Sequence, residues 1–276
     1  MGRDQFDFKA KRTAHFRSCN VSSYTTELLE IHAADPKMHV LFIPGNPGVV
    51  AFYKDFVESL YEFLEGHVSV TAIGHTSHTK KNWDHGRLFS LEEQIDHKMD
   101  FIKQELENIE VPIILVGHSI GSYMAIDIFR RSLEKVTYCI GLYPFLEINS
   151  ESTMQPIIRK IAASQVLSVA ISLVIASLKF LPSWALRLIV TNSLGKSWSA
   201  AALEATCSHL VQYHTIRNSL FMTMTEFQKI SNQVPGIALS TESNHAHTFS
   251  CTEAGSSFVA KFVASLIKNQ LLCSGH

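Results

Sequence analysis

Between residues 38 and 143, short apolar segments alternate with longer amphipathic ones. Apolar runs rich in β-branched side chains are typical of strands that are buried on both faces. The stretches between them are long enough to form helices that connect one parallel strand to the next. This alternation permits few arrangements, and we predict an α/β fold with a doubly wound, mostly parallel sheet.

The predicted elements differ in the periodicity of their apolar residues. In 91–109 apolar side chains recur every three or four residues, which gives one apolar stripe along a helix. The predicted strands are 38–44 (MHVLFIP), 67–73 (HVSVTAI), 112–117 (PIILVG) and 136–143 (VTYCIGLY), and the predicted helices are 49–65, 91–109 and 120–132.

The alternation stops near residue 150. Residues 155–222 contain apolar helical segments and no clear strand. A predicted strand at 236–241 (GIALST) and a closing helix at 257–269 then resume the pattern. We therefore predict one α/β core from residues 20–150 and 226–270, interrupted by a helical cap insertion at 151–225.

The segment 161–178 of this insertion has no charged residue between Lys160 and Lys179. Its 18 residues reach the threshold length of a membrane span. Its Ser and Ala content and the Pro182 and Trp184 that follow favour a segment in a lipid interface or a buried helical cap. We expect contact with a lipid surface through residues 155–190, with the buried cap and the single span as alternatives.

Charge and cysteine content exclude several classes of partner. The net charge is −1, so no excess of basic side chains is present to neutralise phosphates, and we expect no nucleic-acid partner. The five cysteines are widely spaced and form no CxxC pair, which favours a reducing intracellular compartment over a disulfide framework or a zinc site. We expect neither a metal nor a cofactor.

The segment LVGHSIGSYMAIDIF (115–129) places Ser119 in a G-x-S-x-G motif between a predicted strand and a predicted helix. This context is that of a nucleophile elbow, in which flanking glycines allow a tight turn that exposes the serine oxygen. The N-terminus of the helix also favours negative charge. We predict that Ser119 is a nucleophile; a serine in an ordinary glycine-rich turn is the alternative.

A serine nucleophile needs hydrogen-bond donors for the oxyanion that forms on the substrate. The backbone N–H of Ile120, directly after the nucleophile, is the first candidate. The second should come from the loop PGNPG (44–48), and since Pro47 has no N–H, we predict Asn46. Pro, Gly and Asn are also what an ordinary turn uses.

The general base should come late in the chain, in the segment SNHAHTFS (243–250). His247 is our first candidate and His245 the second. His118 and His75 are further candidates for acid/base groups, but a histidine beside a nucleophile elbow, such as His118, is expected to pack or line a pocket. No set of carboxylates or thiols accompanies the two late histidines, which disfavours a metal site.

The acid of a catalytic triad is missing from the sequence. The last aspartate is Asp127, before every position from which that acid is usually supplied. Glu147, Glu226 and Glu242 could in principle substitute, and Glu147, directly after a predicted strand, is the best placed. Exposed carboxylates are most often simply surface residues. Without an orienting acid a serine–histidine pair loses on the order of 10⁴ in turnover.

Four segments carry a resemblance to a known family: VLFIPGNPGVVAFYKDF, FSLEEQIDHKMDFI, ILVGHSIGSYMA and LGKSWSAAALEATCSHLVQYHTIRN. The chain resembles the lipid-droplet-associated hydrolases, in a plant-type form, over residues 20–222 and 228–270. The resemblance implies an α/β-hydrolase fold, a serine triad, and residence on lipid droplets and the endoplasmic reticulum. It implies Ser119 as nucleophile and His247 as base.

The resemblance also implies what is absent. The family's aspartate stands on a strand that reads roughly Phe-Gly-x-x-Asp-x-Trp, and the sequence passes over it at the junction of Phe227 and Gln228. We therefore expect a variant whose sheet lacks one strand, the strand that carries the acid.

Two functions fit these observations. The first is a serine hydrolase of carboxylic esters, lipase-like, with a sterol ester or acylglycerol as substrate, at the cytosolic face of lipid droplets or the endoplasmic reticulum. The second is a catalytically impaired lipid-binding protein at the same surfaces, because the triad aspartate is absent.

Overall fold

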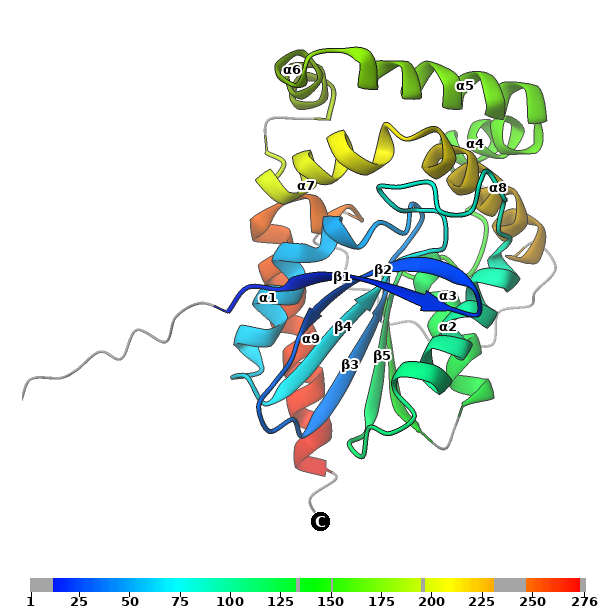
Figure 1. The fold of residues 1–276 in the computed structure, drawn as a ribbon. Helices are drawn as coiled ribbons and strands as arrows, with labels where there is room; N and C mark the ends of the chain where they lie inside the picture. The colour runs from blue at the N-terminus through cyan, green and yellow to red at the C-terminus, as the bar shows by residue number, and fades with distance from the viewer. Residues whose placement is uncertain (1–11, 133–134, 150, 195–196, 231–246, 274–276) are drawn as a thin grey trace, which may run out of the picture.

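The structure is built around one twisted sheet, with six strands in the described residues (Figure 1). It is a computed structural model that describes residues 12–132, 135–149, 151–194, 197–230 and 247–273. The strand order is β1-β2-β4-β3-β5-β6. The strands are β1 (His15–Val21), β2 (Tyr24–Ile31), β3 (Met38–Ile43), β4 (Val68–Ile73), β5 (Ile113–His118) and β6 (Val136–Leu142).

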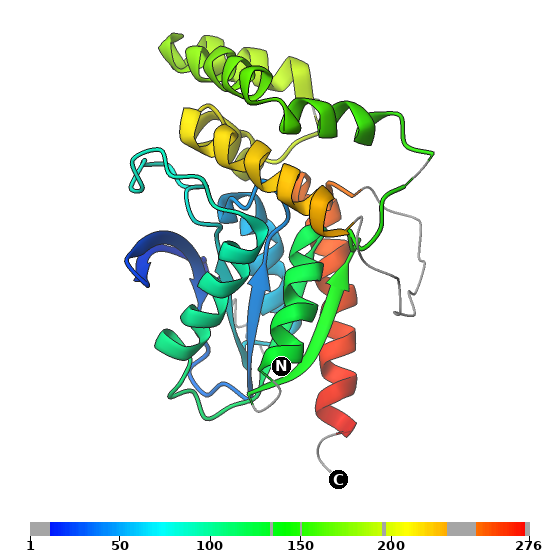
Figure 2. The same cartoon turned by 90° about the vertical axis from the view of Figure 1, so that its right-hand side faces the viewer.

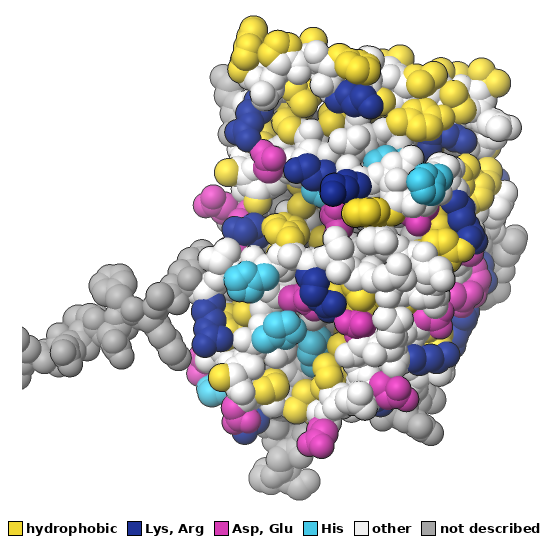
Figure 3. Space-filling view, in the orientation of Figure 1, with side chains coloured by type: hydrophobic (Ala, Val, Ile, Leu, Met, Phe, Trp, Pro, Cys, Tyr) yellow, Lys and Arg dark blue, Asp and Glu magenta, His cyan; other side chains and the backbone are white. Residues whose placement is uncertain are grey.

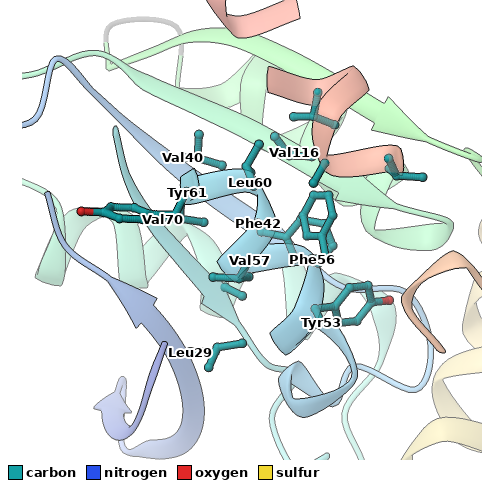
Figure 4. Packing of buried hydrophobic residues seen from close by; sticks show 14 of the residues in the cluster. Leu29, Val40, Phe42, Tyr53, Phe56, Val57, Leu60, Tyr61, Val70 and Val116 are labelled. Atoms are coloured by element: carbon teal, nitrogen blue, oxygen red, sulfur yellow. The ribbon is translucent and has the colours of Figure 1, made fainter. Parts of the chain in front are cut away.

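Strands β3 to β6 are parallel to one another, which confirms the predicted mostly parallel sheet. Helices α1 (Lys54–Phe63) and α9 (Glu253–Cys273) cover one face, and α2 (Leu91–Glu105) and α3 (Ile120–Arg131) cover the other (Figure 2). In Figure 4 the ring of Phe42, on β3, packs against Phe56 of α1, with centroids 5.0 Å apart. The doubly wound α/β prediction is confirmed.

The antiparallel hairpin of β1 and β2 was not predicted. Most side chains of β1 are exposed, so its sequence lacks the apolar run that identifies a buried strand. A tight turn at Ser22 and Ser23, both with positive φ, joins the two strands. β2 then pairs with β4 and places β1 at the edge of the sheet.

Helices α4 to α8 form a layer over the carboxyl ends of the parallel strands, which confirms a helical cap insertion (Figures 1 and 2). They are α4 (Met154–Ala163), α5 (Gln165–Ser177), α6 (Ser183–Leu194), α7 (Ala200–Ala205) and α8 (Tyr213–Ile230), with short helical turns η1 (Val50–Tyr53), η2 (Leu178–Phe180), η3 (Thr206–Leu210) and η4 (Phe249–Cys251). The predicted cap boundary at residue 225 falls inside α8. The division into core and cap at 150 and 225 stays a prediction.

The segment 161–178 is not one continuous helix. α4 ends at Ala163, and Ser164 starts α5 by accepting a hydrogen bond from the N–H of Leu167 on its side chain. In the described residues no single helix is long and apolar enough to cross a membrane. The pair 154–163 and 165–180 meets the length and composition criteria together, with a bend of 99°.

Beyond β6 the described part of the sheet has no further strand. The predicted strand at 236–241 lies outside the described residues. In the described chain β6 therefore pairs with β5 on one side only.

Two glycines allow α3 to approach the sheet closely. A Cβ added at Gly117 would lie 2.2 Å from the carbonyl oxygen of Gly121, and one at Gly121 would lie 2.3 Å from that of Ile43 and 2.4 Å from that of Pro44. These contacts are with backbone atoms, which cannot move aside as a flexible side chain would. The first turn of α3 is thus pressed against the end of β3.

We predict that Gly121→Ala destabilises the protein by roughly 1–3 kcal/mol or more, because the new methyl group overlaps two carbonyl oxygens. The measurement is urea unfolding. Gly141→Ala is the matched control, since its Cβ would come no nearer than 3.3 Å to another atom, the Cβ of Ser122. Equal unfolding midpoints for the two variants would contradict the prediction.

Candidate active site

Ser119 lies on a sharp turn between β5 and α3. Its φ of 55° and ψ of −121° are rare for a residue with a side chain, and such strained conformations are concentrated at functional sites. Its N–H donates to the carbonyl of Leu142, and its carbonyl accepts from the N–H of Phe145. These two hydrogen bonds fix the turn against β6 and the loop after it.

His247 lies beside this serine although 128 positions separate them. Its Nε2 is 3.1 Å from Oγ of Ser119, which is hydrogen-bonding distance. Burial lowers the pKa of His247 below its usual value, so the imidazole is neutral at pH 7 and can accept a proton. A serine hydroxyl that contacts a neutral imidazole is the arrangement needed for general-base activation of a nucleophile.

His118, the residue before Ser119, is buried and contacts two other parts of the site. Its Nδ1 is 2.7 Å from the Tyr53 hydroxyl, and its Nε2 is 3.0 Å from the carbonyl oxygen of His247. The Tyr53 oxygen also accepts a hydrogen bond from the N–H of Gly45, at 3.1 Å. Burial lowers the pKa of His118 to about 3, so this ring is neutral. His118 packs as expected and does not contact the serine oxygen through either nitrogen.

Aromatic rings surround this group. The ring of Phe249 lies 5.0 Å from that of His118 and stacks on Tyr143 at 5.9 Å, and the rings of His118 and His247 are 4.9 Å apart. The ring of Tyr53 is packed on Phe42 in the core (Figure 4). The hydrogen bond between His118 and Tyr53 is therefore set in an apolar environment, where hydrogen bonds are strong, whereas the contact between Ser119 and His247 is exposed.

The loop 44–48 adjoins the serine. A Cβ added at Gly45 would lie 3.2 Å from Cβ of Ser119. The side-chain amide of Asn46 points to α8, where its Nδ2 lies 2.9 Å from the carbonyl of Ser219 and from the side-chain oxygens of Thr223 and Glu226. The predicted oxyanion role of Asn46 therefore concerns its backbone N–H alone, and it stays a prediction.

Ile120 is the first residue of α3. The first N–H groups of a helix have no acceptor within the helix, so the N–H of Ile120 is available to a ligand at the serine. Its predicted role as an oxyanion donor is consistent with this position and stays a prediction.

Glu226 is an ionisable group that the site buries. It is 5% exposed and lies on α8 against Asn46. Burial raises the pKa of its carboxyl to about 8, while the hydrogen bond from Asn46 acts in the opposite direction. The side chain is therefore protonated at pH 7, and its contact is with Asn46, not with His247.

No carboxylate in the described part of the chain forms a hydrogen bond with His247. Glu147, the predicted substitute acid, is exposed in the loop after β6. Glu242 and the second candidate base, His245, lie outside the described residues. The described structure thus brings Ser119 and His247 together and shows no hydrogen bond between Glu147 and either of them, and the role of Glu147 as a substitute acid stays a prediction.

Of three further histidines in the described residues, two have a hydrogen-bond partner and one has none. His209 contacts Glu27 on β2 at 2.9 Å, and His214 contacts the carbonyl of Thr79 at 2.8 Å. Both ring nitrogens of His75 are buried without a hydrogen-bond partner, beside Gly48. The described residues contain no group of three His, Cys, Asp or Glu side chains that could hold a metal ion.

Sequence reasoning missed Tyr53. It stands in the stretch VVAFYKDF (49–56) without a motif of its own, and its hydroxyl becomes significant only because the fold directs it to His118 and Gly45. A buried tyrosine hydroxyl usually has a partner, but the sequence does not say which one.

Comparison with known sequences adds a family to this geometry. The sequence model of the family described as lipid-droplet associated hydrolase matches residues 36–253. Lipid droplet-associated hydrolase of Dictyostelium discoideum is 27% identical over 215 residues, which are 74% of this chain and 67% of that protein. The Gallus gallus protein is 26% identical over 208 residues, which are 71% of this chain and 63% of that protein. The Homo sapiens protein is 33% identical over 132 residues, which are 42% of this chain and 40% of that protein.

The chain therefore spans between 40% and 67% of the length of these three relatives. Among solved structures it is similar to haloalkane dehalogenase DbeA from Bradyrhizobium elkani, with a TM-score of 0.58, 15% identity, and coverage of 77% of this chain and 69% of that one. A bacterial membrane phospholipase A gives a TM-score of 0.53 at 13% identity, covering 79% and 63%. At these identities the likeness shows a common fold, that of the α/β-hydrolases.

We predict that the stability of the protein falls as the pH rises from about 5 to about 8, because Glu226 ionises in the unfolded chain but stays protonated in the folded one. The folded state binds the extra proton in this range, so the free energy of unfolding decreases by on the order of a few kcal/mol. Glu226→Gln keeps the oxygen that accepts from Asn46 and should remove this part of the pH dependence.

The measurement is chemical unfolding of both proteins across this pH range. Glu110→Gln is the control, because it removes a carboxyl at an exposed position. If Glu226→Gln and Glu110→Gln change the pH dependence alike, the carboxyl of Glu226 is not protonated in the folded state.

Proposed function

The chain belongs to the lipid droplet-associated hydrolases, and from this membership we propose that it is a serine hydrolase of carboxylic esters that acts on apolar lipid esters at lipid droplets. The observation that carries the proposal is the 3.1 Å contact between Oγ of Ser119 and Nε2 of His247 at a strained strand–helix turn. A sterol ester or an acylglycerol is the class of substrate that suits a lipid surface.

The proposed reaction runs in two halves. His247 accepts the proton of the Ser119 hydroxyl while Oγ bonds to the ester carbonyl carbon, and the backbone N–H groups of Ile120 and Asn46 donate to the oxyanion. His247 then gives its proton to the departing alcohol, which leaves an acyl ester on Ser119. In the second half His247 accepts a proton from a water molecule whose oxygen bonds to the acyl carbon. The bond between that carbon and Oγ of Ser119 then breaks, Oγ takes the proton from His247, and the carboxylic acid is released.

A second candidate function follows from the missing acid. In the described residues no carboxylate contacts His247, and loss of the orienting acid can lower turnover by on the order of 10⁴. The same chain would then serve as a lipid-binding protein at the droplet with little turnover. Only a measurement of serine reactivity separates this candidate from the first.

Helix α5 supports the placement at a lipid surface. Its buried residues include Ser168 and Ser172, which face α8, whereas Val166 and Val174 are 78% and 68% exposed. A helix in contact with water on its outer side normally shows the opposite pattern. The inverted pattern directs large apolar side chains away from the protein, as expected of a helix whose outer side meets an apolar phase.

The exposed apolar side chains continue from α5 onto its neighbours. Phe180, directly after α5, is 82% exposed, and Trp184 on α6 is 72% exposed. Apolar side chains gather along this edge of the molecule, over α5 and α6 (Figure 3). We call this surface the apolar cap face; it comprises Met154, Ile157, Val166, Leu167, Leu173, Val174, Phe180, Trp184 and Leu188.

An exposed apolar surface of this kind marks an interaction site. Tryptophan and phenylalanine at the water–lipid boundary and leucine or valine further in are typical of helices that lie in an interface. The apolar cap face therefore supports binding to lipid droplets or to the endoplasmic reticulum membrane through residues within 155–190, and it favours an apolar substrate.

The proposed location is the cytosolic face of these membranes. In the described chain Cys19, Cys139, Cys207 and Cys251 are free thiols. Free cysteines are the rule in reducing compartments, which supports this side of the membrane.

We predict that Ser119 is labelled covalently by a fluorophosphonate and that Ser119→Ala abolishes the labelling. The labelling rate should fall as the pH is lowered, with a midpoint below about 6.5, because burial lowers the pKa of the base, His247. His247→Gln should reduce the rate by on the order of 10³ or more.

Ser122→Ala is the matched control, since the Ser122 hydroxyl is buried three positions away and donates to the carbonyl of Gly117. This variant should still be labelled. Absence of labelling in the unmodified protein would favour the lipid-binding candidate over the hydrolase.

We also predict that Phe180→Ser combined with Trp184→Ser weakens binding to phospholipid-coated triolein droplets by about tenfold or more, because each substitution removes an aromatic side chain from the lipid. Flotation of the protein with the droplets measures the bound fraction. Phe16→Ser is the control: Phe16 is 53% exposed on β1, outside the apolar cap face, and its replacement should leave flotation unchanged. Equal effects of the two changes would contradict docking through this face.

A further inference from the structure

We propose that His118 and Tyr53 form a positioning pair that holds the main chain of His247 and the loop 44–48 in fixed places beside Ser119. The pair contacts both segments at once, through the carbonyl of His247 and the N–H of Gly45. Its effect on turnover rests on the proposed function, whereas its geometry does not.

The hydrogen bonds of the pair have only one consistent direction. A carbonyl oxygen can only accept, so Nε2 of His118 must carry the hydrogen that it donates to His247. A neutral imidazole has one N–H, so Nδ1 is the acceptor, and the Tyr53 hydroxyl must donate to it. The Tyr53 oxygen is then left with lone pairs, and one of them accepts from the N–H of Gly45.

The surroundings of His118 favour this neutral tautomer. The rings that face it belong to Tyr53, Tyr143, His247 and Phe249, and no carboxylate of the described residues contacts it to stabilise a charged imidazolium. The side chain of Ser250 also hydrogen-bonds Tyr53, and the second lone pair of the tyrosine oxygen can accept it. The ring is 6% exposed, so water cannot replace these partners readily.

The pair joins segments from three distant parts of the sequence. Tyr53 ends η1 and its ring is packed on Phe42 of β3. His118 ends β5. Together with Tyr53 it connects the loop after β3 to the segment that leads into η4. A side chain fixed in the core thus determines the distance between the candidate oxyanion loop and the candidate base.

This connection is important because no carboxylate of the described residues contacts His247. A triad acid orients its histidine through Nδ1. Here the carbonyl of His247 is held by His118, and the two rings pack at 4.9 Å, so the backbone and the ring of His247 are both restrained from the side of His118. Preorganisation of this kind lowers the cost of reaching the reactive geometry.

The first experiment measures kcat and KM for a short-chain nitrophenyl ester, together with the fluorophosphonate labelling rate, in the full chain. His118→Leu removes both hydrogen bonds, and His118→Gln places an amide N–H near the position of Nε2. We expect His118→Leu to lower kcat by on the order of tenfold or more with little change in KM, and His118→Gln to recover much of the loss. Equal kcat values for the two variants would overturn the proposal.

Tyrosine variants provide the second comparison. Tyr53→Phe removes only the hydroxyl and should lower kcat severalfold. Tyr61→Phe is the matched control, because Tyr61 is a buried tyrosine on α1 whose hydroxyl accepts from Arg12 at the other side of the core. Calorimetric melting shows whether the variants are folded. If Tyr53→Phe and Tyr61→Phe have the same kcat, the Tyr53 hydroxyl does not position the site.

A third measurement does not depend on hydrolysis. The imidazole nitrogens of the unmodified protein are observed by ¹⁵N NMR, and the signals lost in His118→Gln are assigned to His118. We expect a neutral ring protonated on Nε2 from about pH 5.5 to about pH 8. Protonation on Nδ1, or an imidazolium in this range, would overturn the positioning pair. A protein that is unreactive toward esters and fluorophosphonate but shows this tautomer would refute the proposed function and leave the pair intact.

Discussion

The contact between the first turn of α3 and the end of β3 is the constraint on which the site depends. Only because residue 121 lacks a side chain can this turn lie against the carbonyls of Ile43 and Pro44. The approach forces Ser119 into a positive φ and brings the loop after β3 beside its Cβ. The candidate nucleophile and the candidate oxyanion donors are therefore neighbours for a steric reason, which does not depend on catalysis.

The candidate base is brought to this corner from the opposite end of the chain. His247 reaches Ser119 because Phe249 and the rings beside it bury the start of η4 in the core, and His118 holds its carbonyl. No carboxylate of the described residues contacts His247. Apolar packing and a chain of hydrogen bonds between neutral groups provide the restraint that an acid would otherwise supply. Such a restraint fixes the position of the imidazole but does not stabilise its charged form.

The cap adds a second property to the same end of the sheet. Its inner helix, α8, is tied to the core by buried polar contacts, among them Asn218 with the N–H of Phe89 and Asn46 with Glu226. Its outer helices, α5 and α6, bury few large apolar side chains and expose many. One layer thus joins a polar inner side, which shapes the site, to an apolar outer side that suits a lipid surface.

The sequence by itself determined the sheet, the elbow and the family. Apolar runs and glycine spacing are local, so β3 to β6, the strained turn at Ser119 and the helical insertion could be predicted from residues near one another in the chain. The hairpin β1–β2 could not, because most side chains of the edge strand β1 are exposed and its sequence has little apolar signal. The tertiary structure alone decided that His247 lies against Ser119, that Glu226 is buried against Asn46, and that Tyr53 and His118 connect two loops. Each of these depends on which distant segments the packing brings within hydrogen-bonding distance, and no local pattern specifies that.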